Sequence, residues 1–225
     1  GLRLEESVIG IIGFGRIGFE VARLLMAFKP RQLLLHDIQP KRQQIGYLKV
    51  KGMNVRVASF SEVISASNIL SLHVPLYRET RNMIDDEVIK NMVKGAFLLN
   101  TSRGGIIDEN ALYNSLSNGD LGGAALDVFE HEPYTGPLRS LNNLVLTPHL
   151  GSCSVEHDFL LTGGESVPWQ QLSCAGLMRD SVSTLASPLA PESCLLLTPL
   201  HEMHLFHALS RALCSVLVAQ LPAEC

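Results

Sequence analysis

Cysteine is missing from the first 150 residues of the chain, and the whole chain has little excess charge of either sign. The five cysteines lie further on, at positions 153, 174, 194, 214 and 225, and this odd number at irregular spacing predicts neither a disulfide framework nor a zinc module. The formal net charge is only −4, so the sequence offers no basic surface for nucleic acid or an anionic membrane. No stretch of about 18 uninterrupted apolar residues occurs, and we expect no membrane span.

Composition changes near residue 150. Residues 1–150 contain 16 Lys and Arg against 15 Asp and Glu, whereas residues 151–225 contain 2 against 7, and no lysine follows Lys94. We therefore divide the chain into a first domain, residues 1–152, and a tail, residues 153–225. A cysteine-free domain is typical of a reduced, cytoplasmic protein. The sequence begins without methionine, so an organellar targeting signal further upstream stays open.

Short apolar runs alternate with helical patterns in the first domain, which is typical of βαβ units on a parallel sheet. Their continuous apolarity predicts strands that are covered on both faces. Strands are expected at Ser7–Ile12, Leu33–Asp37, Asn54–Val57, Asn68–Val74, Ala96–Thr101, Ala124–Val128 and Leu144–Thr147. Helices are expected at Ile17–Ala27, after Pro40, and at Phe60–Ile64, Asp86–Met92 and Glu109–Leu116. Asp85 and Asp108 are predicted N-caps, and Gly95 and Gly119 are predicted helix stops. The fold class is α/β, a doubly wound parallel sheet of the Rossmann type.

Gly13, Gly15 and Gly18 follow the first predicted strand with the spacing Gly-x-Gly-x-x-Gly. Gly13 permits the tight turn out of the strand, Gly15 lets a cofactor pyrophosphate approach the backbone, and Gly18 lets the next helix pack closely on the strand. Arg16 and Ile17 open that helix, whose unpaired N–H groups point at the phosphates. The three glycines alone could form an ordinary glycine-rich turn. Together with the strand, the helix and a downstream acid they predict a dinucleotide site.

That acid is Asp37, at the end of the second predicted strand. It lies nineteen residues after Gly18, where its carboxylate can accept hydrogen bonds from both hydroxyls of the adenosine ribose. A carboxylate at this place repels the 2′-phosphate of NADP, so NAD is the expected cofactor. Lys41 and Arg42 follow closely and weaken this inference, although both also suit a solvated helix start.

Three segments at predicted strand ends supply a cation, a carboxylate and an imidazole. They are residues 99–105, 126–133 and 146–151. Hydride transfer between a nicotinamide and an alcohol needs these groups, because a proton must leave the hydroxyl as the hydride leaves the carbon. A carboxylate orients the imidazole that takes the proton, and an arginine can hold a substrate carboxylate in a bidentate contact.

Five segments together resemble a known family: residues 10–18, 72–76, 100–108, 125–133 and 146–151. In order and spacing they resemble the cofactor-binding domain of the D-isomer-specific 2-hydroxyacid dehydrogenases, and phosphoglycerate-dehydrogenase-like members in particular. The resemblance covers roughly residues 1–152. It implies an NAD-dependent oxidoreductase that interconverts a small 2-hydroxy acid and a 2-oxo acid, and a homodimer formed through this domain.

The resemblance also implies roles for single residues. The predicted catalytic residues are Arg103, which binds the substrate, Glu132, which supports the imidazole, and His149, which is the acid and base. Asp127 contacts the nicotinamide carboxamide, and the cofactor pocket is lined by Val74, Pro75 and Thr101. Taken singly, the three catalytic candidates also have simpler interpretations, as a surface arginine, a turn carboxylate and a structural histidine at a strand end.

Family members carry a second, substrate domain, built from residues ahead of the cofactor domain and from the chain's end. This sequence starts at the junction, so we expect a truncated form that is weakly active or inactive alone. An NAD-binding regulatory or scaffold protein, similar to the family's corepressor relatives, is the alternative. A nonfunctional truncated product is a third interpretation.

The tail matches no part of the family pattern. Its apolar residues at 205, 209, 213, 216 and 217 predict a helix near residues 203–220, and the remainder is expected to be loop or disorder. In the sequence, Cys214 follows soon after His201, His204 and His207, but these histidines lack the four-residue step of a zinc-binding helix. We therefore predict no metal site.

Overall fold

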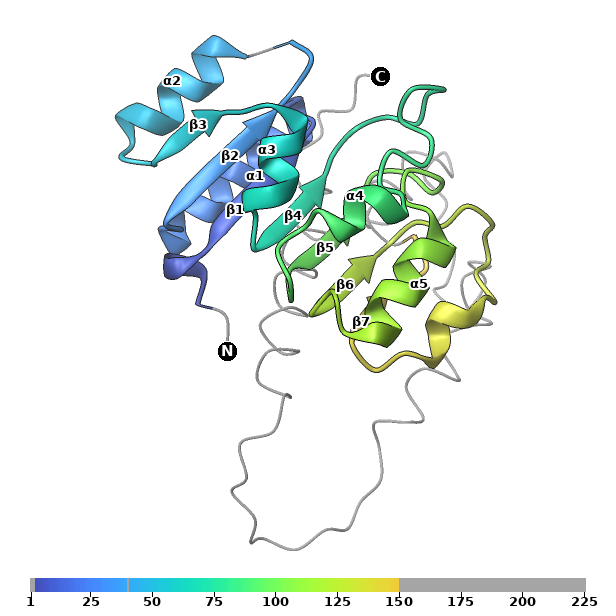
Figure 1. Cartoon of the computed structure of the whole chain (residues 1–225). Helices are drawn as coiled ribbons and strands as arrows, with labels where there is room; N and C mark the ends of the chain where they lie inside the picture. The colour runs from blue at the N-terminus through green and yellow to red at the C-terminus, as the bar shows by residue number, and fades with distance from the viewer. Residues whose placement is uncertain (1–2, 40, 150–225) are drawn as a thin grey trace, which may run out of the picture.

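Seven parallel strands form one sheet, in the order β3-β2-β1-β4-β5-β6-β7 (Figure 1). This computed structural model describes residues 3–39 and 41–149. The strands are β1 (Val8–Ile12), β2 (Gln32–His36), β3 (Val55–Val57), β4 (Ile69–Leu72), β5 (Phe97–Asn100), β6 (Gly123–Leu126) and β7 (Leu144–Leu146). Every residue of β4 and β6 is buried, as expected for strands that are covered on both faces.

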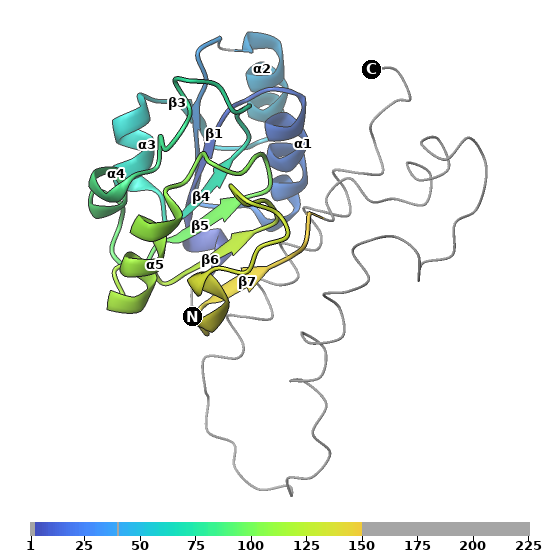
Figure 2. The same ribbon diagram turned by 90° about the vertical axis from the view of Figure 1, so that its right-hand side faces the viewer.

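Five α-helices and three short 3-10 helices accompany the strands, and all but the first 3-10 helix lie between two strands in the sequence. They are η1 (Leu4–Glu6), α1 (Arg16–Leu25), η2 (Met26–Phe28), α2 (Arg42–Val50), α3 (Phe60–Ala66), α4 (Asp86–Lys90), α5 (Glu109–Asn118) and η3 (Pro137–Ser140) within the part of the chain that the structure describes. Figure 2 shows α1 and α2 on one face of the sheet and α3, α4 and α5 on the other. The fold is therefore a doubly wound, three-layer α/β fold, as predicted.

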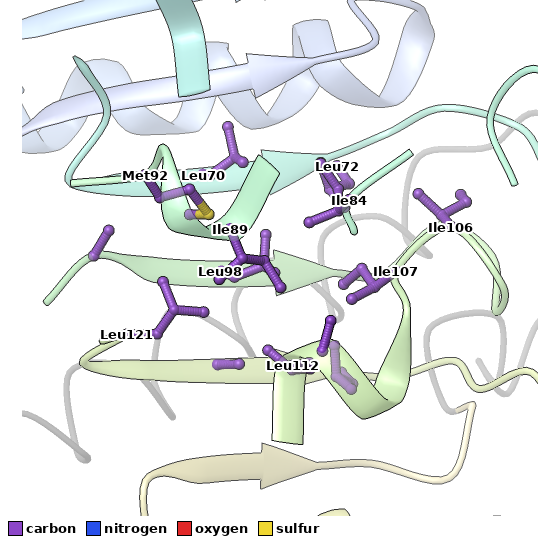
Figure 3. Packing of buried hydrophobic residues seen from close by; sticks show 14 of the residues in the cluster. Leu70, Leu72, Ile84, Ile89, Met92, Leu98, Ile106, Ile107, Leu112 and Leu121 are labelled. Carbon is purple, nitrogen blue, oxygen red and sulfur yellow. The ribbon is translucent and has the colours of Figure 1, made fainter. Parts of the chain in front are cut away.

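Two hydrophobic cores lie on the two faces of the sheet. On the α1 face, Val21, Ala22 and Leu25 present one stripe of the helix to buried residues of β1 and β2. On the other face, α4 and α5 pack over β4, β5 and β6. Figure 3 shows this packing through Leu70 and Leu72 of β4, Ile89 of α4, Leu98 of β5 and Leu112 of α5.

Side-chain caps begin three of the helices. Asp85 accepts the backbone N–H of Val88 in α4, and Asp108 accepts those of Asn110 and Ala111 in α5, as predicted. Ser59 caps α3 by accepting the backbone N–H of Glu62, and this cap was not among the predicted ones. Gly119 ends α5 in the left-handed conformation, as predicted. The same prediction for Gly95 is wrong, because α4 ends at Lys90 with Asn91 as its C-cap, and Gly95 forms a separate turn before β5.

All seven predicted strands and all five predicted helices are present, with ends that differ by a few residues at most. None of the helices in residues 3–39 and 41–149 is both long and apolar enough to cross a membrane. The helix predicted near residues 203–220 and the rest of the predicted tail lie outside the described residues.

Candidate functional site

The candidate site lies where the carboxyl ends of the parallel strands meet, along one edge of the sheet (Figure 1). The neighbours β1 and β4 are separated by two strands in the sequence, and the chain proceeds from them toward opposite edges. Ligands of doubly wound sheets bind in the crevice outside such a switch point. The predicted site residues follow β1, β2, β4, β5, β6 and β7, so the fold places them all along this edge.

The turn after β1 requires glycine at two positions. Gly13 has a φ of +90°, and a Cβ there would lie 2.5 Å from the carbonyl oxygen of His73, which directly follows the neighbouring strand β4. A Cβ on Gly18 would collide with the carbonyl oxygen of Gly13, so the helix approaches the turn only with glycine at this place. Both glycines thus have the structural roles predicted for them.

Gly15 is different, because among residues 3–39 and 41–149 no atom beyond its immediate chain neighbours lies within 4 Å of where its Cβ would be. Its φ of −77° suits any residue, so neither strain nor crowding explains the glycine. It is the N-cap of α1, it has no side chain to cap the first turn, and Arg16 and Ile17 begin the helix with exposed side chains. An open backbone beside an uncapped helix N-terminus fits a pyrophosphate group, whose oxygens accept N–H bonds.

Asp37 is bonded to the glycine turn itself. Its Oδ2 accepts the backbone N–H of Phe14 at 2.6 Å, and its Oδ1 accepts that of Gln39 at 2.6 Å. Asp37 is half-buried, and each carboxylate oxygen can accept more than one bond. Asp37 can therefore also accept hydrogen bonds from sugar hydroxyls. The next side chain, Ile38, is 92% exposed, so this end of β2 is open to a ligand.

Val74 and Pro75 follow β4, and Thr101 follows β5. Val74 is the nearest side chain to Gly13, with its Cγ1 2.9 Å from the place of a Cβ on that glycine. Val74 and Thr101 are half-buried and Pro75 is exposed. Asp127, after β6, is almost fully buried, and it accepts the hydroxyl of Thr147 at 2.6 Å. All four residues therefore follow β4, β5 or β6 at the carboxyl end of the sheet.

Arg103 stands on a loop that a buried amide organises. Asn100, which is 2% exposed, donates from Nδ2 to the carbonyl of Arg103 at 2.9 Å. Its Oδ1 accepts both the backbone N–H and the hydroxyl of Ser102. The Arg103 side chain is exposed, and its Nη1 donates to the carbonyl of Ser102 at 2.6 Å. The loop thus holds a guanidinium at the sheet edge.

Glu132 and His149 are 17 residues apart in the sequence, and the structure brings them together. Nδ1 of His149 lies 2.9 Å from Oε2 of Glu132, and Oε1 of Glu132 accepts the backbone N–H of Phe129 at 3.0 Å. A carboxylate on Nδ1 selects the tautomer with its proton there and leaves Nε2 as a proton acceptor. The side chain of His149 is 42% exposed and that of Glu132 is 36% exposed, so solvent and ligands can reach the pair.

His73 received no role from the sequence, yet it lies at the switch point. Its Nε2 is 2.9 Å from the hydroxyl of Ser71, which is 4% exposed. Burial lowers the pKa of His73 to about 4, so the ring is neutral at physiological pH. His73 as a whole residue is half-buried. The pattern of apolar residues could not reveal its environment, because only the tertiary structure surrounds the ring with protein. No group of three or more metal-ligating side chains converges in residues 3–39 and 41–149.

Comparison with known proteins identifies the family of this chain. Residues 1–151 match the family model of the D-isomer specific 2-hydroxyacid dehydrogenase, NAD binding domain. The chain belongs to the D-isomer-specific 2-hydroxyacid dehydrogenases. The predictions of family, fold class and NAD as the cofactor are thereby confirmed. The roles of single residues stay predictions, as does the domain boundary at residue 152.

Individual relatives of the family are similar over the same segment. A glyoxylate reductase of Korarchaeum cryptofilum is 41% identical over 158 residues, which cover 69% of this chain and 46% of that protein. A hydroxypyruvate reductase of Thermotoga maritima is 38% identical over 160 residues, which cover 69% and 49%. The crystal structure of D-lactate dehydrogenase from Aquifex aeolicus, complexed with NAD and lactic acid, matches with a TM-score of 0.61 and 30% identity, over 72% of this chain and 56% of that one. The chain thus spans about half the length of the relatives it matches.

Proposed function

We propose that this chain supplies the NAD site and the proton-transfer residues of a dehydrogenase that interconverts a small 2-hydroxy acid and its 2-oxo acid. The observation that carries the proposal is the hydrogen bond of 2.9 Å between His149 and Glu132, on the same sheet edge as the glycine turn. The printed names of the relatives, glyoxylate reductase and hydroxypyruvate reductase, support this substrate class.

The NAD site combines backbone and side chain. The turn at Gly13–Gly18 binds the pyrophosphate through the N-terminus of α1, and Asp37 binds the adenosine ribose. Bound NAD⁺ supplies the acceptor for the hydride that leaves C2 of the hydroxy acid. Asp37 favours NAD over NADP, because its carboxylate repels a 2′-phosphate.

The catalytic chemistry follows from the orientation of His149. As the hydride leaves C2, Nε2 of His149 takes the proton of the hydroxyl, and the carboxylate of Glu132 stabilises the imidazolium that forms. In the reverse direction the same nitrogen returns the proton to the oxo group. Arg103 binds the substrate carboxylate with two parallel N–H bonds, which fixes C2 relative to the nicotinamide.

The test is a pair of measurements on the purified chain. Calorimetry should show one NADH site. A spectrophotometric assay with glyoxylate or hydroxypyruvate should show at most weak oxidation of NADH, because the chain spans about half the length of its relatives, and the variant His149→Asn should abolish that oxidation. NADH binding with a turnover that His149→Asn leaves unchanged would contradict the dehydrogenase and favour the alternative, an NAD-binding regulatory protein. Absence of binding would contradict both.

A homodimer through the cofactor domain is part of the same proposal, because the family resemblance implies it. Sedimentation equilibrium of the purified chain tests it, and a mass equal to that of one chain at micromolar concentration would contradict it. The cytoplasmic location stays a prediction.

A further inference from the structure

One peptide unit, between Phe129 and Glu130, lies between two loops of the candidate site. Its carbonyl packs directly on Gly104, the residue after Arg103, and a Cβ on that glycine would collide with it. Its N–H donates to Oε1 of Glu109 at 2.8 Å. The orientation of this single peptide therefore affects both the loop that carries Arg103 and the turn that carries Glu132.

Glu109 is the first residue of α5, but the helix does not need it as a cap. Asp108 already accepts the N–H groups of Asn110 and Ala111 in the first turn. Glu109 is half-buried, and burial raises the pKa of its carboxyl, with the nearby Glu130 carboxylate adding to the rise. The Glu130 N–H and His131 act in the opposite direction. A carboxylate that is costly to bury and unnecessary for capping needs another explanation, and its bond to the peptide supplies one.

A second contact holds the same turn from the other side. Nη1 of Arg81 lies 2.9 Å from the side chain of Glu130. Both side chains are about half exposed, so solvent screens the pair and its contribution is small. The bond to Glu109 acts on the backbone itself rather than on a side chain, which makes Glu109 the more direct constraint on the peptide.

We propose that Glu109 is a positioning residue that fixes the Phe129–Glu130 peptide and thereby aims Glu132 at Nδ1 of His149. The chain of contacts is continuous. Glu109 holds the N–H of Glu130, the preceding N–H of Phe129 is held by Glu132, and Glu132 reaches His149. The catalytic meaning of this arrangement rests on the proposed function, whereas the geometric effect does not.

The experiment is NMR of the histidine rings in the whole chain, uniformly labelled with ¹⁵N. Long-range ¹H–¹⁵N spectra report which ring nitrogen carries the proton, and His149→Asn identifies the signals of His149 among the eight histidines. The wild-type chain should show His149 with its proton mainly on Nδ1. Glu109→Ala should lower the ratio of the Nδ1–H to the Nε2–H tautomer by at least about threefold.

Two further variants separate positioning from general destabilisation. Glu109→Gln keeps a carbonyl that can accept the Glu130 N–H and should preserve the wild-type ratio. Glu109→Asp keeps the charge but is one methylene too short, and it should lower the ratio as Glu109→Ala does, which keeps the test valid where the alanine variant does not fold. A wild-type ratio in folded Glu109→Asp or Glu109→Ala would overturn the proposal.

The affinity for NADH, measured on the same variants, separates a failure of the proposed function from a failure of the positioning role of Glu109. It should stay within about twofold of the wild-type value, because Glu109 makes no bond to the glycine turn or to Asp37. If the wild-type chain binds no NADH, the proposed function fails even though the tautomer ratio still responds to Glu109. If the ratio is insensitive to Glu109 while NADH binds, only the positioning role fails.

Discussion

The carboxylate of Asp37 accepts the backbone N–H of Phe14 at 2.6 Å and so fastens the end of β2 to the turn after β1. The residue proposed to bind the ribose is thus attached to the turn proposed to bind the diphosphate. One side chain therefore sets the distance between the proposed ribose site and the proposed diphosphate site. Its second oxygen is held by Gln39, so the carboxylate has a fixed orientation before any ligand arrives.

The variant Asp37→Asn should weaken NADH binding by about tenfold or more, because hydrogen bonds to a charged group contribute about 1.5–3 kcal/mol. It should weaken NADPH binding less, because the repulsion of the 2′-phosphate is removed. Isothermal calorimetry with both nucleotides measures the two effects. Asp120→Asn, which alters an exposed aspartate outside the site, is the matched control. An unchanged ratio of NADH to NADPH affinity in Asp37→Asn would remove Asp37 from the site.

Two glycines of the turn should respond differently to alanine. Gly15→Ala should leave the free energy of unfolding unchanged or raise it by about 0.5 kcal/mol, because the place of the Cβ is empty and φ suits alanine. It should nevertheless weaken NADH binding, since the methyl group occupies the space proposed for the pyrophosphate. Urea unfolding and calorimetry on the same sample measure both quantities. Full NADH affinity in this variant would contradict the proposed location of the diphosphate.

Gly18→Ala should instead destabilise the fold by about 3 kcal/mol, because its Cβ collides with the backbone carbonyl of Gly13 and the helix must move. Urea unfolding measures the loss. An alanine at this position without a decrease in stability would show that the turn and the helix are not as close as described.

His73 predicts a dependence of stability on pH. Its folded pKa is about 4, below the ordinary value of 6.5, so the unfolded chain binds the proton more readily than the folded chain. The free energy of unfolding should therefore decrease as the pH falls from about 6.5 toward 4, by up to about 3 kcal/mol from this residue. Above pH 6.5 the ring is neutral in both states and contributes no pH dependence.

The variant His73→Gln isolates that contribution. It keeps a polar group near Ser71 and cannot acquire the buried charge, so its stability should decrease less than that of the wild-type chain over the same interval. Chemical unfolding at pH 7, 6, 5 and 4.5 measures the difference between the two. Parallel curves for wild-type and variant would show that the folded structure does not lower the pKa of His73.

His149→Asn should lower the rate of 2-oxo acid reduction by about 10²–10⁴-fold, the range typical of a lost general acid. The affinity for NADH should change by less than about twofold, because the cofactor contacts lie on other loops. His131→Asn, which alters an exposed histidine on the neighbouring turn, is the control. Equal rates for the wild-type chain and His149→Asn would show that His149 is not the acid and base.

The sequence predicted the sheet well because the signals of its strands are local. Continuous apolar runs mark β1, β4 and β6, and the aspartates before α4 and α5 mark the helix starts. The 3-10 helices η1 and η3 escaped prediction, because three or four residues carry no periodicity. Gly95 was misinterpreted because a glycine with positive φ stops a helix and makes a turn equally well.

Part of the candidate site was predictable from the spacing of motifs, and the pairing of Glu132 with His149 from the resemblance to the family. The glycine turn and Asp37 follow from spacing along one βαβ unit. The bond of Glu109 to the Glu130 N–H joins residues 21 apart, and the burial of His73 depends on neighbouring strands. Such contacts are products of tertiary packing, so neither composition nor periodicity could have revealed them.

The most direct test of the account is a calorimetric titration of the purified chain with NADH and, separately, with NADPH. The account predicts one saturable NADH site per chain, with an affinity at least about tenfold above that for NADPH. No heat of binding with either nucleotide, or equal affinities for the two, would contradict the dinucleotide site at Gly13–Gly18 and Asp37.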